Sequence, residues 1–177
     1  TQAVIEFKTR AMALAPGLTP VQPARQVMRL QTGVVDMEEY QRAITETQTI
    51  ESEPGLFRIR PLPPAPEGFL GAVGQFEVEA SVEAEEIRVG ESLAWTVTLS
   101  GTGNWPAISG LPPRQVSRDF QVIGEPELAE DSGSSLFERS LSETVTLIPQ
   151  RAGRYVLGAF EVVAFDPAMG RYVRHRT

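Results

Sequence analysis

Six glutamates lie between residues 77 and 91 and are the first group in the chain that could do chemistry. They are Glu77, Glu79, Glu83, Glu85, Glu86 and Glu91. Carboxylates could hold Ca²⁺, which takes roughly six to eight oxygen ligands. The Asp- and Asn-rich spacing of calcium loops is missing, however, and Glu77 and Glu79 occupy the polar side of an alternating segment. We interpret the cluster as a solvated face and expect no metal site.

Nucleophilic catalysis is equally poorly supported. His175 is the only histidine and stands two residues from the C-terminal end, where a Ser-His-Asp arrangement is hard to build. The chain has no cysteine, which excludes disulfides, thiolate metal sites and cysteine nucleophiles. We therefore expect no catalytic residue, no cofactor and no enzymatic activity.

The loop Gly101-Thr-Gly-Asn-Trp-Pro106 carries the two candidate interaction residues, Asn104 and Trp105. Its glycines allow close approach to another surface, and exposed loop aromatics are frequent interface anchors. Two alternatives stay open: Trp105 folds back over the open end of the fold, or it contacts a partner or ligand. Trp95, in contrast, stands in a regularly alternating segment and is predicted to lie in the core.

The elements that position these residues have the two-residue period of strands. Segments 75–82 and 91–100 alternate apolar and polar side chains, and strands are also predicted over 119–123, 136–148, 153–165 (bent at Gly158) and 171–174. Residues 125–135 read as an exposed acidic loop, and residues 101–106 as a loop. About seven short strands in about 100 residues predict an all-β, immunoglobulin-like (Ig-like) β-sandwich, with a small β-barrel as the alternative.

Before residue 60 the pattern is less regular. Strands are expected over 4–14, 26–32 and 56–60, with Pro16-Gly17 as a turn. Within residues 34–50, Asp36 and Glu39 have capping-box spacing, so the stretch from Asp36 to Ala43 is predicted either to include one or two helical turns or to form an irregular loop. Thr45–Glu51 is predicted to be extended from its residue propensities. Leu14-Ala-Pro-Gly-Leu-Thr resembles Leu147-Ile-Pro-Gln-Arg-Ala-Gly-Arg-Tyr, which suggests the end of a second Ig-like module.

Four prolines between residues 61 and 66 exclude a helix or a central strand there. We therefore predict three parts: residues 1–60 as the C-terminal portion of a preceding Ig-like module, residues 61–74 as a Pro/Gly-rich linker, and residues 75–177 as the Ig-like β-sandwich.

Charge is divided unevenly across this junction. Residues 1–66 carry seven Lys+Arg and seven Asp+Glu, whereas residues 67–177 carry nine Arg and sixteen Asp+Glu, and 9 − 16 = −7 accounts for the net charge. We therefore expect neither nucleic acid nor an anionic membrane surface as a partner, because both require a basic surface. The acidic charge is compatible with a basic protein as the partner, and this alternative stays open.

Several segments resemble the BatD family of bacterial envelope proteins associated with aerotolerance. The resemblance covers most of the chain, and its more specific parts are the proline junction from Pro61 to Phe76 and Phe165-Asp-Pro-Ala-Met-Gly-Arg-Tyr. Further matching stretches are Val89-Gly-Glu, Ser100-Gly-Thr-Gly-Asn and Leu147-Ile-Pro-Gln-Arg-Ala-Gly-Arg-Tyr, with Thr9-Arg-Ala-Met-Ala-Leu, Leu30-Gln-Thr-Gly and Ser52-Glu-Pro before the junction.

This resemblance implies a tandem Ig-like region in the periplasm, in a protein with a signal peptide and a C-terminal anchor in the inner membrane. We expect the present chain to be a soluble fragment of such a protein. Family members are encoded with von Willebrand A-type membrane proteins and a MoxR-type ATPase, so the implied role is non-enzymatic protein–protein interaction. The alternative is a carbohydrate-binding or adhesin-like sandwich that uses Trp105 as a stacking platform.

Overall fold

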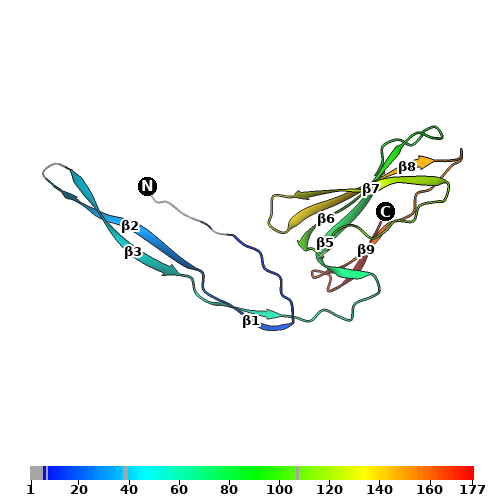
Figure 1. Ribbon diagram of the computed structural model, residues 1–177. Coiled ribbons are helices and arrows are strands. Elements are labelled where there is room, and N and C mark those ends of the chain that lie inside the picture. Colours follow the sequence, from blue (N-terminus) through cyan, green and yellow to red (C-terminus); the bar gives the residue numbers. More distant parts are fainter. Residues whose placement is uncertain (1–5, 7, 38–39, 107) are drawn as a thin grey trace. The chain divides into compact units, whose positions relative to one another are not determined.

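The computed structural model describes residue 6 and residues 8–37, 40–106 and 108–177, and this part of the chain is all-β. Ten strands are present there, and they belong to two compact units: Ala13–Leu62, and Pro63–Thr177 together with the residues before Ala13 (Figure 1). Within the described ranges, nothing is helical, so no helix is long and apolar enough to cross a membrane.

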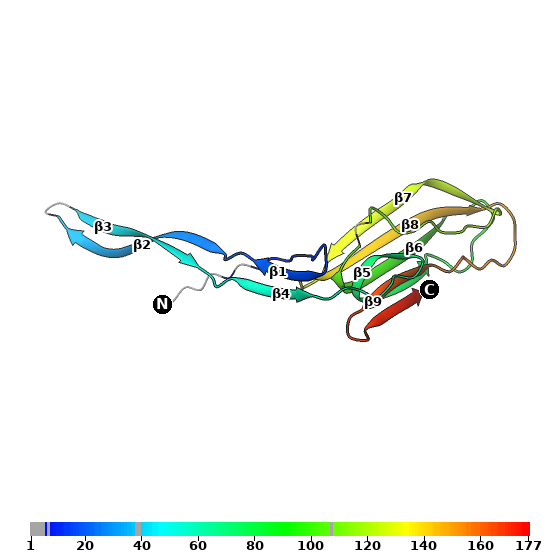
Figure 2. The same cartoon turned by 90° about the horizontal axis from the view of Figure 1, so that it is seen from below.

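The smaller unit consists of two antiparallel strand pairs. β1 (Gly17–Val21) pairs with β4 (Gly55–Ile59), and β2 (Arg25–Asp36) pairs with β3 (Gln41–Glu51) (Figure 2). The strands predicted over 26–32 and 56–60 are thus confirmed. The strand expected over 4–14 is wrong for residues 8–14, which form none, and Val4, Ile5 and Phe7 lie outside the described residues.

Asp36 and Gln41–Ala43 are strand residues of a β-hairpin, so the helical-turn and irregular-loop predictions are both wrong for them, whereas the extended conformation predicted for Thr45–Glu51 is confirmed. Asp36 ends β2, and its proposed capping partner Glu39 lies outside the described residues. The run from Ile44 to Ile50 is rich in threonine and isoleucine, which pack well on a pleated surface and raise β propensity. That preference outweighs the single capping-box signal.

The larger unit is built from six strands in the order β10-β9-β5-β6-β8-β7. Their bounds are β5 Phe69–Val82, β6 Leu93–Asn104, β7 Phe120–Ser132, β8 Glu138–Pro149, β9 Glu161–Asp166 and β10 Arg171–Arg176. All neighbouring pairs are antiparallel except β5 and β9. β5 takes part in both layers, because its first residues pair with β9 and Val73–Val82 pair with β6. Gly74, with φ of 150°, lies just after this change of partner, where a side chain would be strained.

The core lies between the β6–β8 part of the sheet and β9. Leu93, Trp95, Val97 and Leu99 alternate along β6, and Leu141, Val145 and Leu147 alternate along β8. All of these except Leu93 form one buried cluster with Phe160, Val162 and Ala164, from β9 and the residue before it. Burying each large side chain contributes roughly 1.5–3 kcal/mol. These contacts confirm the sandwich prediction and the core position of Trp95.

Three local predictions in this unit need correction. Residues 125–132 belong to β7 rather than to a loop, and Gly101–Asn104, predicted as loop, are the last residues of β6. β7 is an edge strand with solvent-exposed side chains, so acidic residues are tolerated, and a bulge between Ile123 and Glu127 accommodates Gly124 and Pro126. Over 153–165 only Glu161–Phe165 are strand, because the preceding residues have no neighbouring strand to pair with.

Tyr172 of β10 fixes the proline segment that precedes β5. Its hydroxyl donates a hydrogen bond to the carbonyl of Pro63 at 2.8 Å, and its ring packs edge-on against Phe69 and Phe165, with centroid separations of 5.0 and 5.2 Å. β5 begins at Phe69, so residues 69–74 of the predicted linker are part of this strand.

Gly101 is expected to tolerate no side chain, because the backbone of β5 passes directly against it. A Cβ atom there would clash with the carbonyl oxygen of Gln75 and lie 2.7 Å from Cδ1 of Phe76. Gly101→Ala should therefore lower the free energy of unfolding by about 1–3 kcal/mol, as overpacking does elsewhere. Urea unfolding followed by tryptophan fluorescence measures this. Ser100→Ala, one residue earlier, is the control and should change stability by less than about 0.5 kcal/mol; equal losses would contradict the packing argument.

Candidate functional site

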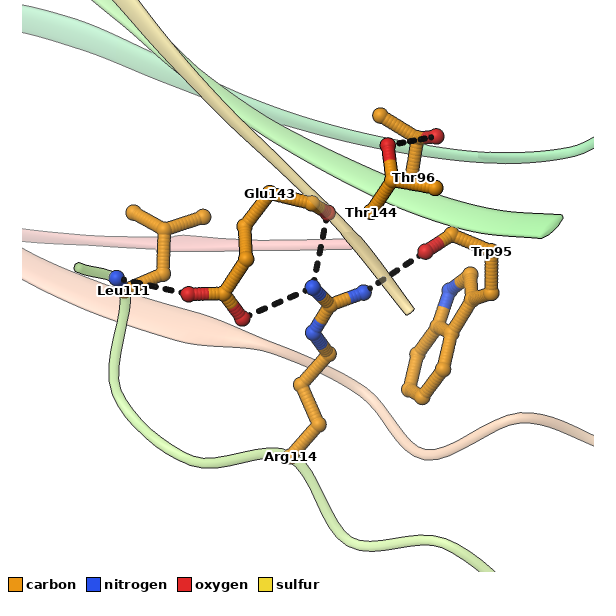
Figure 3. Close-up of polar contacts among 6 residues, drawn as sticks. All are labelled: Trp95, Thr96, Leu111, Arg114, Glu143 and Thr144. Atoms are coloured by element: carbon orange, nitrogen blue, oxygen red, sulfur yellow. Dashed lines mark hydrogen bonds and ion pairs between the residues drawn. The ribbon is translucent and has the colours of Figure 1, made fainter. Parts of the chain in front are cut away.

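The connection from β6 to β7 is held against the inner face of the sheet by one arginine. The side chain of Arg114 is 3% exposed. Its Nη1 donates to the carbonyl oxygen of Trp95 at 2.9 Å, and its Nη2 donates to the carbonyl oxygen of Glu143 at 2.7 Å (Figure 3). Through these bonds a residue of an irregular segment is attached to both central strands, β6 and β8.

Glu143 supplies the opposite charge. It stands on β8 between Leu141 and Val145, at a position that faces the core, and its side chain is 9% exposed. Oε1 accepts a hydrogen bond from Nη2 of Arg114 at 2.8 Å, and Oε2 accepts one from the backbone N–H of Leu111 at 3.1 Å. We call Arg114, Glu143, the N–H of Leu111 and the carbonyl of Trp95 the Arg114 clamp.

The guanidinium of Arg114 also stacks over the ring of Trp95, 4.8 Å from its centroid. A cation over an indole face gains roughly 2 kcal/mol when both groups are shielded from water. Among the described residues the Nε–H of Arg114 finds no acceptor. A buried charge is costly unless it is paired and hydrogen-bonded, and the clamp provides both. Its role is therefore to fix the chain connection rather than to present a charge to a substrate.

Hydroxyl groups join the same two strands on the opposite face of the sheet. Thr96 and Thr144 lie 2.8 Å apart, and Thr98 and Ser142 lie 2.9 Å apart, each pair joined by a hydrogen bond. Cross-strand pairs of this kind contribute about 0.2–1 kcal/mol each. They stabilise the β6–β8 register, which in turn places the carbonyl of Trp95 and the side chain of Glu143 for Arg114.

Trp105 lies inside the structure. It is 9% exposed, its ring packs edge-on against Phe76 at 5.3 Å, and the guanidinium of Arg139 lies 5.4 Å from its centroid. Its indole N–H is buried without a hydrogen-bond partner among the described residues. Asn104, half-buried, is the last residue of β6. This conformation corresponds to the alternative in which Trp105 covers the fold, and an interaction role for Asn104 and Trp105 stays a prediction.

The acidic cluster and His175 are not brought into a common site. The six glutamates between residues 77 and 91 are all exposed, and Glu91 accepts a hydrogen bond from the backbone of Arg88. His175 lies on β10, opposite Val162. In the part of the chain that the structure describes, no three His, Asp or Glu side chains are grouped so that they could hold a metal ion.

Sequence reasoning missed the Arg114 clamp, although one signal for it was present. Leu141, Val145 and Leu147 share the inward parity of β8, and Glu143 has the same parity. A carboxylate at a core position needs a cationic or hydrogen-bonding partner. The sequence does not show which of the nine arginines after residue 66 supplies it, because the connection that carries Arg114 has no regular period.

The fold and the clamp together define an Ig-like β-sandwich whose long β6–β7 connection is pinned into the core. Residues 80–176, more than half of the chain, match the family model of the BatD DUF11 like domain. The chain therefore belongs to the BatD family. No curated protein and no solved structure matches it.

Proposed function

We propose that this chain is a non-enzymatic protein-interaction module of a membrane-anchored BatD-type envelope protein that acts in the periplasm. The observation that carries the proposal is the family match over residues 80–176, which spans almost the whole sandwich. By family resemblance the partners are von Willebrand A-type membrane proteins and a MoxR-type ATPase system, and the cellular role concerns oxygen tolerance. The molecular task is to hold such partners together at the envelope.

An apolar stripe on the smaller unit supports an interaction role. The register of β2 and β3 shifts between Gln31 and Gly33, so that Leu30 and Val35 lie on the same face of the hairpin. That face carries five large apolar residues, each opposite a polar residue or Gly33: Met28, Leu30, Val35, Ile44 and Ile50. Leu30, Val35, Ile44 and Ile50 are between 37% and 51% exposed. A two-stranded hairpin is marginally stable in water by itself, and contiguous exposed apolar surface marks interaction sites. A protein surface packed on this face would stabilise the hairpin.

Affinity capture from envelope extracts tests the proposal. The tagged 177-residue chain, used as bait in gentle detergent, should recover von Willebrand A-type proteins, whereas the tag alone should recover none. The purified chain should show no turnover on hydrolase substrate panels. Failure to recover any von Willebrand A-type protein would contradict the proposed partner class. Turnover that is lost on replacing a glutamate of the acidic cluster would contradict the non-enzymatic role.

A further inference from the structure

The six-stranded sheet of the larger unit does not close on itself, so it ends in two edge strands, β7 and β10. Figure 2 shows them on opposite sides of this unit, with β10 in red. Among the described residues, no backbone group on the free side of either strand forms a hydrogen bond. Unpaired backbone groups at a sheet edge are a template for pairing with a strand of another chain.

Only alternate residues of an edge strand direct their backbone groups to the free side. The N–H of Gly133 donates to the carbonyl of Glu138, so the odd-numbered residues from 127 to 131 bond to β8. The N–H of Thr177 donates to the carbonyl of Phe160, so the odd-numbered residues of β10 bond to β9. The free sides therefore carry the backbone groups of three even-numbered residues each: Leu128, Glu130 and Ser132 on β7, and Tyr172, Arg174 and Arg176 on β10.

The two edges carry opposite charge. β7 has four acidic residues and no basic one, and β10 has three arginines and no acidic residue: Glu125, Glu127, Glu130, Asp131, Arg171, Arg174 and Arg176. One charge on each strand is already paired, Glu130 with Arg139 and Arg174 with Glu161. Counting these partners leaves −4 + 1 = −3 on β7 and +3 − 1 = +2 on β10. Asp166, opposite Arg171 on β9, lowers the second value to +1, and the signs stay opposite.

These charges select one of the three ways in which two copies of the sheet can join. Pairing β7 with β7 places acidic strands side by side, and pairing β10 with β10 places arginines side by side; like charges across a strand pair are destabilising. Pairing β7 with β10 brings opposite charges together. The lengths also agree, because the regular part of β7 after its bulge, residues 127–132, has as many residues as β10, residues 171–176.

We propose that copies of this chain associate edge to edge, with β7 of one copy and β10 of the next forming an antiparallel strand pair. The register that uses all three free residues of each strand places Glu130 opposite Arg174. Because the two joined surfaces differ, each copy keeps one free edge, and the assembly grows beyond a dimer. The inference goes beyond the proposed function, since it concerns contacts between copies of the chain and involves no other protein.

Sedimentation velocity of the 177-residue chain tests the self-association. At low salt the sedimentation coefficient should rise with concentration, with a Kd between about 10 µM and 1 mM, as expected for a small contact. Added salt should weaken the association. Glu130→Arg and Arg174→Glu, at side chains that are 58% and 57% exposed, should each weaken it at least about tenfold.

Mixing the two charge-reversed variants tests whether the contact joins two different edges. Each variant keeps one unaltered edge, so an equal mixture should associate although neither variant does so alone. The double variant Glu130→Arg/Arg174→Glu exchanges the two signs and should recover association to within about threefold of the unaltered chain. Glu79→Arg and Arg154→Glu, at exposed positions outside both edges, should change association less than about twofold. Unchanged circular dichroism and tryptophan emission establish that each variant is folded.

Cross-linking tests the register, because the chain has no cysteine of its own. In the proposed register Ala129 and His175 of adjacent copies form a pair without mutual hydrogen bonds. Such pairs have Cα atoms about 4.5 Å apart, within the reach of a disulfide. An Ala129→Cys chain mixed with a His175→Cys chain should therefore form a disulfide-linked dimer on oxidation, and neither chain alone should do so.

Four results would overturn the inference. They are a sedimentation coefficient that does not change with concentration, equal weakening by edge and control variants, no association in the mixture of the two charge-reversed variants, and association that stops at a dimer. Oxidation that links either cysteine variant to itself as readily as to the other would show a like-with-like contact and would also contradict it.

Discussion

Replacing Glu143 with alanine is expected to lower the free energy of unfolding of the sandwich by about 3–5 kcal/mol, because the change leaves the buried guanidinium of Arg114 without an opposite charge. The guanidinium of Arg114, whose side chain is 3% exposed in the unaltered chain, would lose its carboxylate partner, and the N–H of Leu111 would lose its acceptor. Urea unfolding followed by tryptophan fluorescence measures the effect. Both tryptophans, Trp95 and Trp105, lie in the sandwich, so the signal reports on this unit.

Two controls separate the buried charge from a generic loss of contacts. Glu161→Ala removes the partner of Arg174 in an exposed pair, where the side chains are 41% and 57% exposed, and should cost less than about 1 kcal/mol. The double variant Arg114→Met/Glu143→Leu replaces the buried pair by apolar groups and should lose much less stability than Glu143→Ala. If Glu143→Ala and Glu161→Ala cost the same, the clamp does not contribute as described.

The sandwich could be predicted from the sequence because its core strands alternate strictly. In β6 every second side chain from Leu93 to Leu99 is buried, so one face of the strand is apolar in the sequence itself. Binary alternation reports burial on one face, and burial on one face is what a two-layer fold requires. The same logic correctly placed Trp95 inside.

Strands without a buried face could not be recognised from alternation. The side chains of β7 after Phe120 and of all of β3 are exposed, so nothing in their sequences distinguishes a strand from a loop except propensity. Their strand state comes from backbone pairing with β8 and β2, which depends on the neighbour and not on local pattern. Residues 153–159 show the converse, since the pattern is that of a strand but no neighbouring strand is present.

The candidate site could be predicted only in part from the sequence, for a related reason. The sequence singled out Trp105 but did not decide between two orientations of its side chain. An aromatic residue in a loop can turn inward or outward with the same local sequence. The clamp depends on a contact between residues 29 positions apart, and its arginine lies in a segment with no period. Side-chain pairing across an irregular connection is a tertiary property that alternation does not encode.

Trp105→Ala is expected to destabilise the sandwich by about 3 kcal/mol, because it removes a buried aromatic at the end of the core. The indole packs on Phe76 and under Arg139, and a cavity there leaves both without their contact. Denaturant unfolding followed by far-ultraviolet circular dichroism measures the loss without relying on the deleted fluorophore. Val156→Ala, at a side chain that is 95% exposed, is the control and should change stability by less than about 0.5 kcal/mol.

The same variant discriminates the stacking alternative. A carbohydrate platform needs an open ring face, whereas the ring of Trp105 is 9% exposed and contacts both Phe76 and Arg139. We therefore expect the unaltered chain to bind no member of a glycan array. If it binds a glycan, and Trp105→Ala abolishes that binding with a loss of stability below about 1 kcal/mol, the ring is a contact surface and the core assignment is wrong. A large stability loss without any glycan binding places Trp105 with Trp95 among the residues that hold the sandwich together.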